Sequence, residues 1–165
     1  MAEGVRIGVL TLSDKGSRGQ RVDASGPLLT ELVAPLGEVV FQQLLPDEQA
    51  QIEELLRVWS DREQLDLILT TGGTGLAPRD RTPEATREVI DREVPGIAEA
   101  MRIQNLVRTP RAMLSRGIAG LRGKTLIVNL PGSPKAVKEN LQVILPALEH
   151  ALQTSSGNGA ECARP

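Results

Sequence analysis

Four short apolar runs alternate along the chain with segments of helical periodicity. The runs are VRIGVLTL (Val5–Leu12), VVFQQLL (Val39–Leu45), LDLILTT (Leu65–Thr71) and TLIVNL (Thr125–Leu130), and their β-branched and aliphatic residues are typical of strands. Strands that alternate with helices predict an α/β fold whose sheet is mostly parallel.

Apolar residues recur three or four positions apart in the segments between these runs. The first helix is predicted from Ser25, with its leucines on one face, and Gly37 ends it. Asp47 is placed to begin the second helix as its N-cap, and Trp59 completes the apolar face of that helix. Further helices are predicted from Thr82-Pro83, over residues 97–107, and from Ser133-Pro134.

The length of the chain predicts a single domain. The chain has 165 residues, the size of one ordinary domain, and shows no internal repeat and no linker. The domain is expected to cover residues 1–153, although residues 108–123 show no pattern that favours helix or strand. The last segment, 154–165 (TSSGNGAECARP), has the polar composition of a disordered tail.

Composition and charge exclude several classes of protein. Lys and Arg number 19 and Asp and Glu 21, so the net charge of −2 argues against a general binder of nucleic acids or membrane surfaces. Aromatic residues make up 1% of the chain, too few for base-stacking platforms. One cysteine, Cys162, and one histidine, His150, exclude an intrachain disulfide and zinc sites built on several such residues. With no apolar run of about 20 residues and no signal-peptide pattern, we expect a cytoplasmic location.

Candidate chemistry gathers where the predicted strands end, because ligands of parallel α/β sheets bind beyond the carboxyl ends of the strands. The third strand runs into TTGGTG (residues 70–75). Its glycines allow a tight turn whose backbone N–H groups approach phosphate oxygens; the alternative is an ordinary strand-to-helix turn. The segment is not a P-loop, because no Gly-Lys-Ser/Thr follows, and it lacks the last glycine of the dinucleotide fingerprint.

Two carboxylates are expected beside this loop. Asp80 lies between two arginines just after the glycines. Since Thr82 is placed to cap the next helix, Asp80 is available to bind Mg²⁺ or to orient a reacting group; a surface ion pair is the alternative. Asp47 is a suitable helix cap, but it also reaches the same edge of the sheet as Asp80. Two carboxylates beside a phosphate-binding turn are typical of a divalent-cation site.

The two remaining strand ends also carry polar groups. In NLPGSPK (residues 129–135), Ser133 is placed as a helix cap, and the helix N-terminus with its lysine suits an anion, although a capped helix without a ligand fits equally well. The first strand ends in TLSD (residues 11–14), and the polar stretch that follows is either a mobile lid or a plain loop. Ser115 receives no role from its neighbours in the sequence.

Six segments together resemble the molybdenum cofactor biosynthesis proteins of the MoaB/Mog type, and the same domain is similar to the G domain of gephyrin. They are TTGGTGLAPRDRTPEAT (70–86), LTLSD (10–14), DASGP (23–27), LPDE (45–48), AMLSR (112–116) and NLPGSPKAV (129–137). The glycine motif combined with the RDRTPEA segment is specific, whereas LTLSD and LPDE are weak singly. The resemblance runs from about Val5 to Leu152.

The resemblance implies a three-layer α/β/α domain, commonly a homotrimer, that transfers AMP from ATP to molybdopterin with Mg²⁺ and releases pyrophosphate. The carboxylates matching Asp47 and Asp80 are implied to be catalytic and to hold the metal. The expected substrate-binding residues are Thr11, Ser13, Asp14, Thr71, Gly72, Gly73, Thr74, Gly75, Ser115, Asn129, Pro131, Gly132 and Ser133. A molybdenum-insertion protein is an expected partner. A non-catalytic molybdopterin carrier or scaffold is the alternative, and a nucleotide-diphosphate hydrolase is a more distant one.

Overall fold

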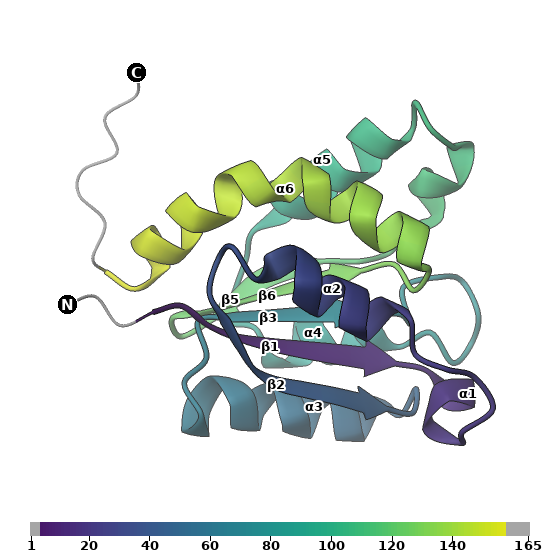
Figure 1. Cartoon of the computed structure of the whole chain (residues 1–165), viewed down its shortest axis with the longest axis horizontal. Coiled ribbons are helices and arrows are strands. Elements are labelled where there is room, and N and C mark those ends of the chain that lie inside the picture. The colour runs from purple at the N-terminus through teal and green to yellow at the C-terminus, as the bar shows by residue number, and fades with distance from the viewer. Residues whose placement is uncertain (1–3, 158–165) are drawn as a thin grey trace.

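A six-stranded sheet forms the centre of the fold in the computed structural model, which describes residues 4–157 (Figure 1). Its strands are β1 (Arg6–Leu12), β2 (Glu38–Leu45), β3 (Leu67–Thr71), β4 (Arg92–Glu93), β5 (Ala119–Arg122) and β6 (Thr125–Leu130). The strand order is β2-β1-β3-β6-β5-β4. The first four strands in this order are parallel, whereas β5 is antiparallel to β6 and to β4. The predicted α/β fold with a mostly parallel sheet is confirmed.

Helices cover both faces of the sheet and produce three layers. The helical segments are α1 (Asp14–Ser17), α2 (Ser25–Val33), α3 (Gln49–Arg57), a π-helical turn (Val58–Arg62), α4 (Thr82–Val89), α5 (Pro95–Asn105), a 3-10 turn (Pro110–Leu114) and α6 (Pro134–Ser155). Helices α2, α5 and α6 pack on one face of the sheet, and α3 and α4 pack on the other (Figure 1). None of the described helices is long and apolar enough to span a bilayer.

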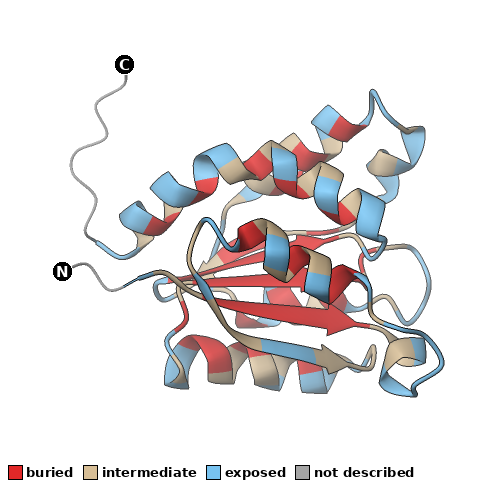
Figure 2. Ribbon diagram, viewed as in Figure 1, coloured by how far each residue is buried: buried red, intermediate tan, exposed pale blue. Residues whose placement is uncertain are grey.

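Each central strand divides its side chains between two apolar cores. In β3, Leu67 and Leu69 pack with α2, α5 and α6, whereas Ile68 packs with α3 and α4. All of β3 is buried, and the central strands form the buried middle layer (Figure 2). A parallel strand covered on both faces has no polar side, which explains why these strands read as continuous apolar runs.

Several elements differ from the sequence prediction. Strands β4 and β5 were not expected: β4 has two exposed residues, and β5 lies in the segment that showed no pattern. Helix α5 ends at Asn105, before the predicted end at Val107. Helix α6 continues to Ser155, so the first two residues of the predicted tail are helical, and residues 158–165 lie outside the described residues.

Candidate functional site

The carboxyl ends of four parallel strands meet at one edge of the sheet. The register pairs Thr11 with Thr71, and Thr71 with Leu130, while Leu12 pairs with Leu45. The strands β1, β2, β3 and β6 therefore end at nearly the same level. The strand order changes direction between β1 and β3, the position where open α/β sheets bind their ligands.

A first cavity of about 660 Å³ opens at this edge. It brings together most of the predicted site residues, namely Thr11, Ser13, Asp14, Asp47, Thr71, Gly72, Gly73, Asp80, Gly132 and Ser133. It also contains two cations that the sequence analysis did not assign to the site, Lys15 and Arg21. They belong to the polar stretch that follows β1, and its polar composition was the only feature of the sequence that could have indicated them. That stretch contains the short helix α1 and forms part of the cavity wall.

The glycine loop that follows β3 has a backbone conformation suited to glycine. Gly72 and Gly73 have φ angles of 100° and 68°, in the left-handed region. A Cβ atom at Gly73 would overlap the hydroxyl of Thr82. That hydroxyl donates a hydrogen bond to the carbonyl of Gly72 at 2.9 Å, and the Thr82 N–H donates to the carbonyl of Gly73 at 3.2 Å. Thr82 thus anchors the glycine loop. The prediction that Thr82 is the N-cap of α4 is wrong, because α4 begins at Thr82 and Arg81 is in the N-cap position.

Asp47 is bonded to Asp14 in a reciprocal arrangement. Its Oδ2 accepts a hydrogen bond from the backbone N–H of Asp14 at 3.0 Å, and Asp14 Oδ1 accepts one from the backbone N–H of Asp47 at 3.0 Å. The prediction that Asp47 caps the following helix is wrong: Glu48 holds that position and makes no side-chain cap. The other oxygen, Asp47 Oδ1, is buried and has no hydrogen-bond partner within the described residues.

The pKa values of Asp14 and Asp47 are shifted in opposite directions. Burial raises the pKa of Asp47, and the negative charges of Asp14 and Asp80 raise it further, against the lowering effect of the Asp14 hydrogen bond. Asp14 instead receives two hydrogen bonds from the guanidinium of Arg79, which lower its pKa to about 2. Arg79 also donates to Glu48 at 2.8 Å. The Asp14 carboxylate is therefore ionised and is held by Arg79, whereas Asp47 presents a buried oxygen without a hydrogen-bond partner in the described residues, beside the glycine loop.

Asp80 is held by the loop that carries it. Its Oδ2 accepts a hydrogen bond from the N–H of Ala77 at 2.9 Å, and its own N–H donates to the carbonyl of Ala77 at 2.9 Å. In the described part of the chain the flanking arginines pair elsewhere, Arg79 with Asp14 and Glu48, and Arg81 with Gln49 and Glu84. The alternative of a surface ion pair for Asp80 is thus not seen. Asp80 contributes to the wall of the first cavity.

A second cavity of about 690 Å³ lies across the glycine loop from the first. It contains four of the five remaining predicted pocket residues, Thr74, Gly75, Ser115 and Pro131, and it shares Ser133 with the first cavity. It also contains residues that the sequence analysis missed, including Leu76, Asn105, Arg108, Arg111, Leu114 and Asn140. Arg108, Arg111 and Leu114 come from the segment 108–123, which shows no periodicity that could have placed them.

Asn129 is the one predicted pocket residue that reaches neither cavity. It is buried, and its amide nitrogen donates to the hydroxyls of Thr70 at 3.0 Å and Thr86 at 2.9 Å. Its amide oxygen accepts from the N–H of Ile118 at 3.2 Å. These bonds join β3, α4 and the residue that precedes β5, so Asn129 supports the site from within the core.

The described residues contain no cluster of three or more His, Cys, Asp or Glu side chains that could hold a metal ion. A cation bound here would need oxygen ligands from a substrate besides the carboxylates of Asp47 and Asp80. Such mixed coordination is common for Mg²⁺, which is usually held by one or two carboxylates, substrate phosphates and water.

Comparisons with known proteins agree with this geometry. The family model described as "Probable molybdopterin binding domain" matches residues 8–150. The chain is 43% identical over 157 residues to the molybdopterin adenylyltransferase of Helicobacter pylori strain J99, a match that covers 93% of this chain and 89% of that protein. It is 47% identical over 152 residues to the Drosophila melanogaster molybdenum cofactor synthesis protein cinnamon, covering 91% of this chain and 25% of cinnamon, so the chain spans a quarter of that relative. The crystal structure of the molybdopterin biosynthesis enzyme MoaB from Thermus thermophilus superposes with a TM-score of 0.88 at 59% identity, over 93% of this chain and 97% of that one.

Proposed function

The chain belongs to the molybdopterin-binding domain family, and on that premise we propose that it transfers AMP from ATP to molybdopterin. A terminal phosphate oxygen of molybdopterin attacks the α-phosphorus of ATP, the bond to the bridging oxygen breaks, and pyrophosphate leaves. The observation that carries the proposal is the pair of cavities on either side of one glycine loop, with Asp47 and Asp80 beside it. Two substrates must meet at one phosphorus atom, and adjoining cavities that share a wall provide for this.

The first cavity is the site we assign to the triphosphate of ATP. The glycine loop brings backbone next to the cavity without side chains in the way, and backbone N–H groups bind phosphate oxygens well. Lys15 and Arg21 supply positive charge at the same wall. The net charge of −2 gives the chain as a whole no attraction for an anionic substrate, so these local groups must provide it.

Mg²⁺ is the cation that fits the two carboxylates. The buried, unpartnered Oδ1 of Asp47 is an oxygen ligand without a bond inside the described protein, and Gly73 brings backbone close to it. Asp47 and Asp80 would hold the ion together with phosphate oxygens of ATP. Once bound, Mg²⁺ neutralises charge on the phosphates and so favours attack by a second anion.

The second cavity is the site we assign to molybdopterin. Leu76, 67% exposed, and Leu114, 48% exposed, provide apolar surface for a flat heterocycle. Arg108, Arg111 and Lys135 line the same cavity and can hold the phosphate of this substrate. This combination of an apolar wall and several cations suits a molecule with a ring at one end and a phosphate at the other.

The chain's own residues act by positioning and by charge stabilisation. The attacking group is a substrate oxygen, so the reaction requires no protein nucleophile. Preorganised N–H donors and cations are worth most where negative charge develops in the transition state, here on the oxygens of the α-phosphate.

A two-substrate assay tests this function. Purified chain is mixed with MgATP and molybdopterin, and pyrophosphate and adenylylated molybdopterin are measured. We expect both products, and only when both substrates are present. Molybdopterin binding without pyrophosphate release would instead identify a carrier or scaffold, and release of phosphate from ATP alone would identify a hydrolase.

We further propose that the protein works in the cytoplasm as a homotrimer and passes its product to a molybdenum-insertion protein. The family resemblance suggests the number of subunits. An exposed apolar strip on the α5 side supports an interface: Ile103 is 63% exposed and Val107 is 88% exposed. The oligomeric state follows from light scattering, and product transfer from a coupled assay with the insertion protein.

A further inference from the structure

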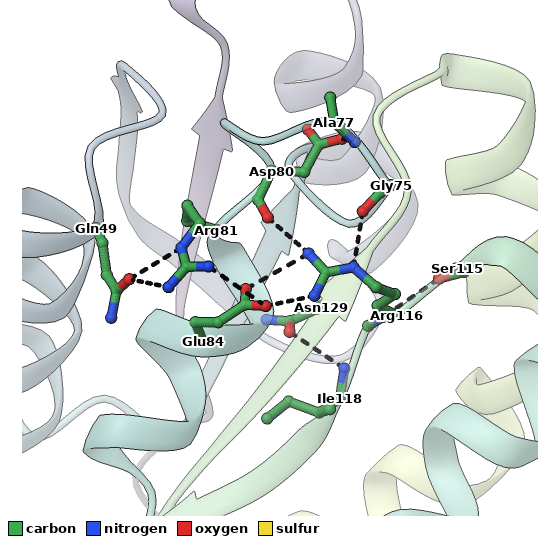
Figure 3. A network of polar contacts seen from close by, with 11 residues as sticks. Gln49, Gly75, Ala77, Asp80, Arg81, Glu84, Ser115, Arg116, Ile118 and Asn129 are labelled. Carbon is green, nitrogen blue, oxygen red and sulfur yellow. Dashed lines mark hydrogen bonds and ion pairs between the residues drawn. The ribbon is translucent and has the colours of Figure 1, made fainter.

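Arg116 bonds to one residue from the wall of each cavity, Gly75 of the second and Asp80 of the first (Figure 3). It follows Ser115, which lines the second cavity. The backbone N–H of Arg116 donates to the carbonyl of Thr74 at 2.9 Å. Its guanidinium donates to the carbonyl of Gly75 at 2.8 Å and to the carbonyl of Asp80 at 2.6 Å. One residue therefore joins the beginning and the end of the loop that runs from Thr74 to Asp80.

The guanidinium is itself fixed by Glu84 in the first turn of α4. The Glu84 carboxylate accepts hydrogen bonds from both terminal nitrogens of Arg116, and these bonds lower the pKa of Glu84. The two side chains are only 36% and 23% exposed. A partly buried pair with several hydrogen bonds holds its geometry better than a flexible surface pair.

The Arg116 bonds help to place Asp80, in addition to the bonds by which Thr82 anchors the glycine loop. The N–H and the carboxylate of Asp80 are both bonded to the backbone of Ala77, and its carbonyl is bonded to Arg116. The bonds to Ala77 lie within the loop, so they fix its internal shape but not its position on the sheet. The bond to Arg116 links the Asp80 end of the loop to the segment that carries Ser115.

We propose that Arg116 is a positioning residue for adenylyl transfer, which fixes Asp80 of the first cavity relative to Ser115 in the wall of the second. This role rests on the proposed function. Without the guanidinium each substrate retains the contacts of its own cavity, but the two reacting phosphates lose their alignment. Misplacement by about 1 Å lowers a rate by as much as ~10²-fold.

The test compares Arg116→Lys and Arg116→Gln with a matched control, Arg122→Lys. Arg122 has the same bonding chemistry far from the site: it donates two bonds to Asp61, at 2.9 and 2.7 Å, and one to the carbonyl of Val89 at 2.8 Å. Lysine keeps the charge at either position but cannot bridge a carboxylate and carbonyl groups at once, because it lacks the planar fork of donors. The readouts are kcat, the KM for each substrate, and the melting temperature.

We expect kcat to fall about tenfold in Arg116→Lys and about a hundredfold in Arg116→Gln, while each KM changes less than about threefold. Arg122→Lys should lose a similar amount of thermal stability and keep its kcat. An equal loss of kcat in Arg122→Lys, or a loss at Arg116 that resides wholly in KM, overturns the positioning role and leaves the proposed function intact. If Arg116→Gln fails to fold, Arg116→Lys decides alone. A wild-type protein that releases no pyrophosphate overturns the proposed function, and this role with it.

Discussion

Replacement of Asp47 by asparagine distinguishes the effect of this side chain on the stability of the fold from its effect on the rate of the reaction. Asparagine has nearly the same shape, and its amide oxygen can still accept the hydrogen bond that the Asp14 N–H now gives to Oδ2 at 3.0 Å. What disappears is the negative charge of the carboxylate, whose Oδ1 atom is buried and has no partner among residues 4–157.

The sign of the effect follows from the pKa. Because burial raises the pKa of Asp47 in the folded state, the ionised form is less favourable in the folded chain than in the unfolded one. The cost is absent below the unfolded pKa, grows as pH rises through the folded pKa, and is complete above it. An unpartnered buried polar group costs ~1–3 kcal/mol, and more when it is charged. Asparagine keeps an unpartnered group at the position of Oδ1 but removes the charge, so we expect Asp47→Asn to be about 1 kcal/mol more stable than the wild type at pH 7. For a domain of this size that is a rise of about 2–4 °C in melting temperature.

The reaction should respond in the opposite direction. If Asp47 holds the cation that accompanies ATP, its loss should lower kcat by ~10²–10³-fold, the usual cost of removing one electrostatic contact to a transition state. MgATP should raise the melting temperature of the wild type and raise that of the variant much less. The measurements are thermal unfolding at pH 7 and pH 3, with and without MgATP, and pyrophosphate release.

Asp61→Asn is the matched control, because the hydrogen bonds from Arg122 lower the pKa of Asp61 and it lies outside both cavities. That variant should lose stability at pH 7 and keep full activity. A lower melting temperature for Asp47→Asn than for the wild type at pH 7 would show that the fold favours the ionised carboxylate, contrary to the burial argument. Undiminished turnover would remove Asp47 from the reacting phosphates.

Three further changes address the loop, the second carboxylate and the assembly. Gly73→Ala should weaken binding of a non-hydrolysable ATP analogue in calorimetry by about tenfold or more, since φ is 68° and the left-handed region costs other residues ~1–2 kcal/mol; unchanged affinity in a folded variant would place the nucleotide elsewhere. Asp80→Asn should lower kcat about a hundredfold while the melting temperature stays within a few degrees, because the amide oxygen can keep the bond to Ala77; parental turnover contradicts its role. Leu106→Glu with Val107→Glu should dissociate the oligomer in light scattering, since both side chains are exposed; a monomeric parent rejects the interface.

The sequence predicted the part of the fold that is buried on both sides. The strands β1, β3 and β6 have hardly any polar face, so their apolar runs identified them directly. The edge strand β4 has two exposed residues and gives no such signal. Strand β5 includes Gly120, where a Cβ atom would come within 2.7 Å of the Arg92 carbonyl, a close approach that depends on tertiary pairing and not on local pattern.

The candidate site also contains parts that the sequence predicted and parts that it did not. The glycine loop, Asp47 and Asp80 could be predicted because they follow strands whose ends must meet at one edge. Helix caps were assigned wrongly at Asp47 and Thr82, since residue type alone does not distinguish a cap from a side chain that bonds to a neighbouring loop. The cationic part of the second cavity was missed. Arg108 and Arg111 reach it through the packing of α5 and the 3-10 turn, and hydrophobic periodicity in the sequence does not indicate this packing.

The unfavourable ionisation of the buried Asp47 carboxylate in the free protein also affects the free energy of substrate binding. The segments after β1, β2 and β3 place Asp14, Asp47 and Asp80 around one loop, and the charges of Asp14 and Asp80 both act against ionisation of Asp47. Arg79 compensates the charge of Asp14, whereas Asp47 Oδ1 stays buried without a partner in the part of the chain that the structure describes. A ligand that brings positive charge to that oxygen relieves the cost, so part of its binding free energy comes from removal of an unfavourable interaction already present in the free chain. The two cores on either side of the sheet supply the stability that allows the strand ends to keep this arrangement.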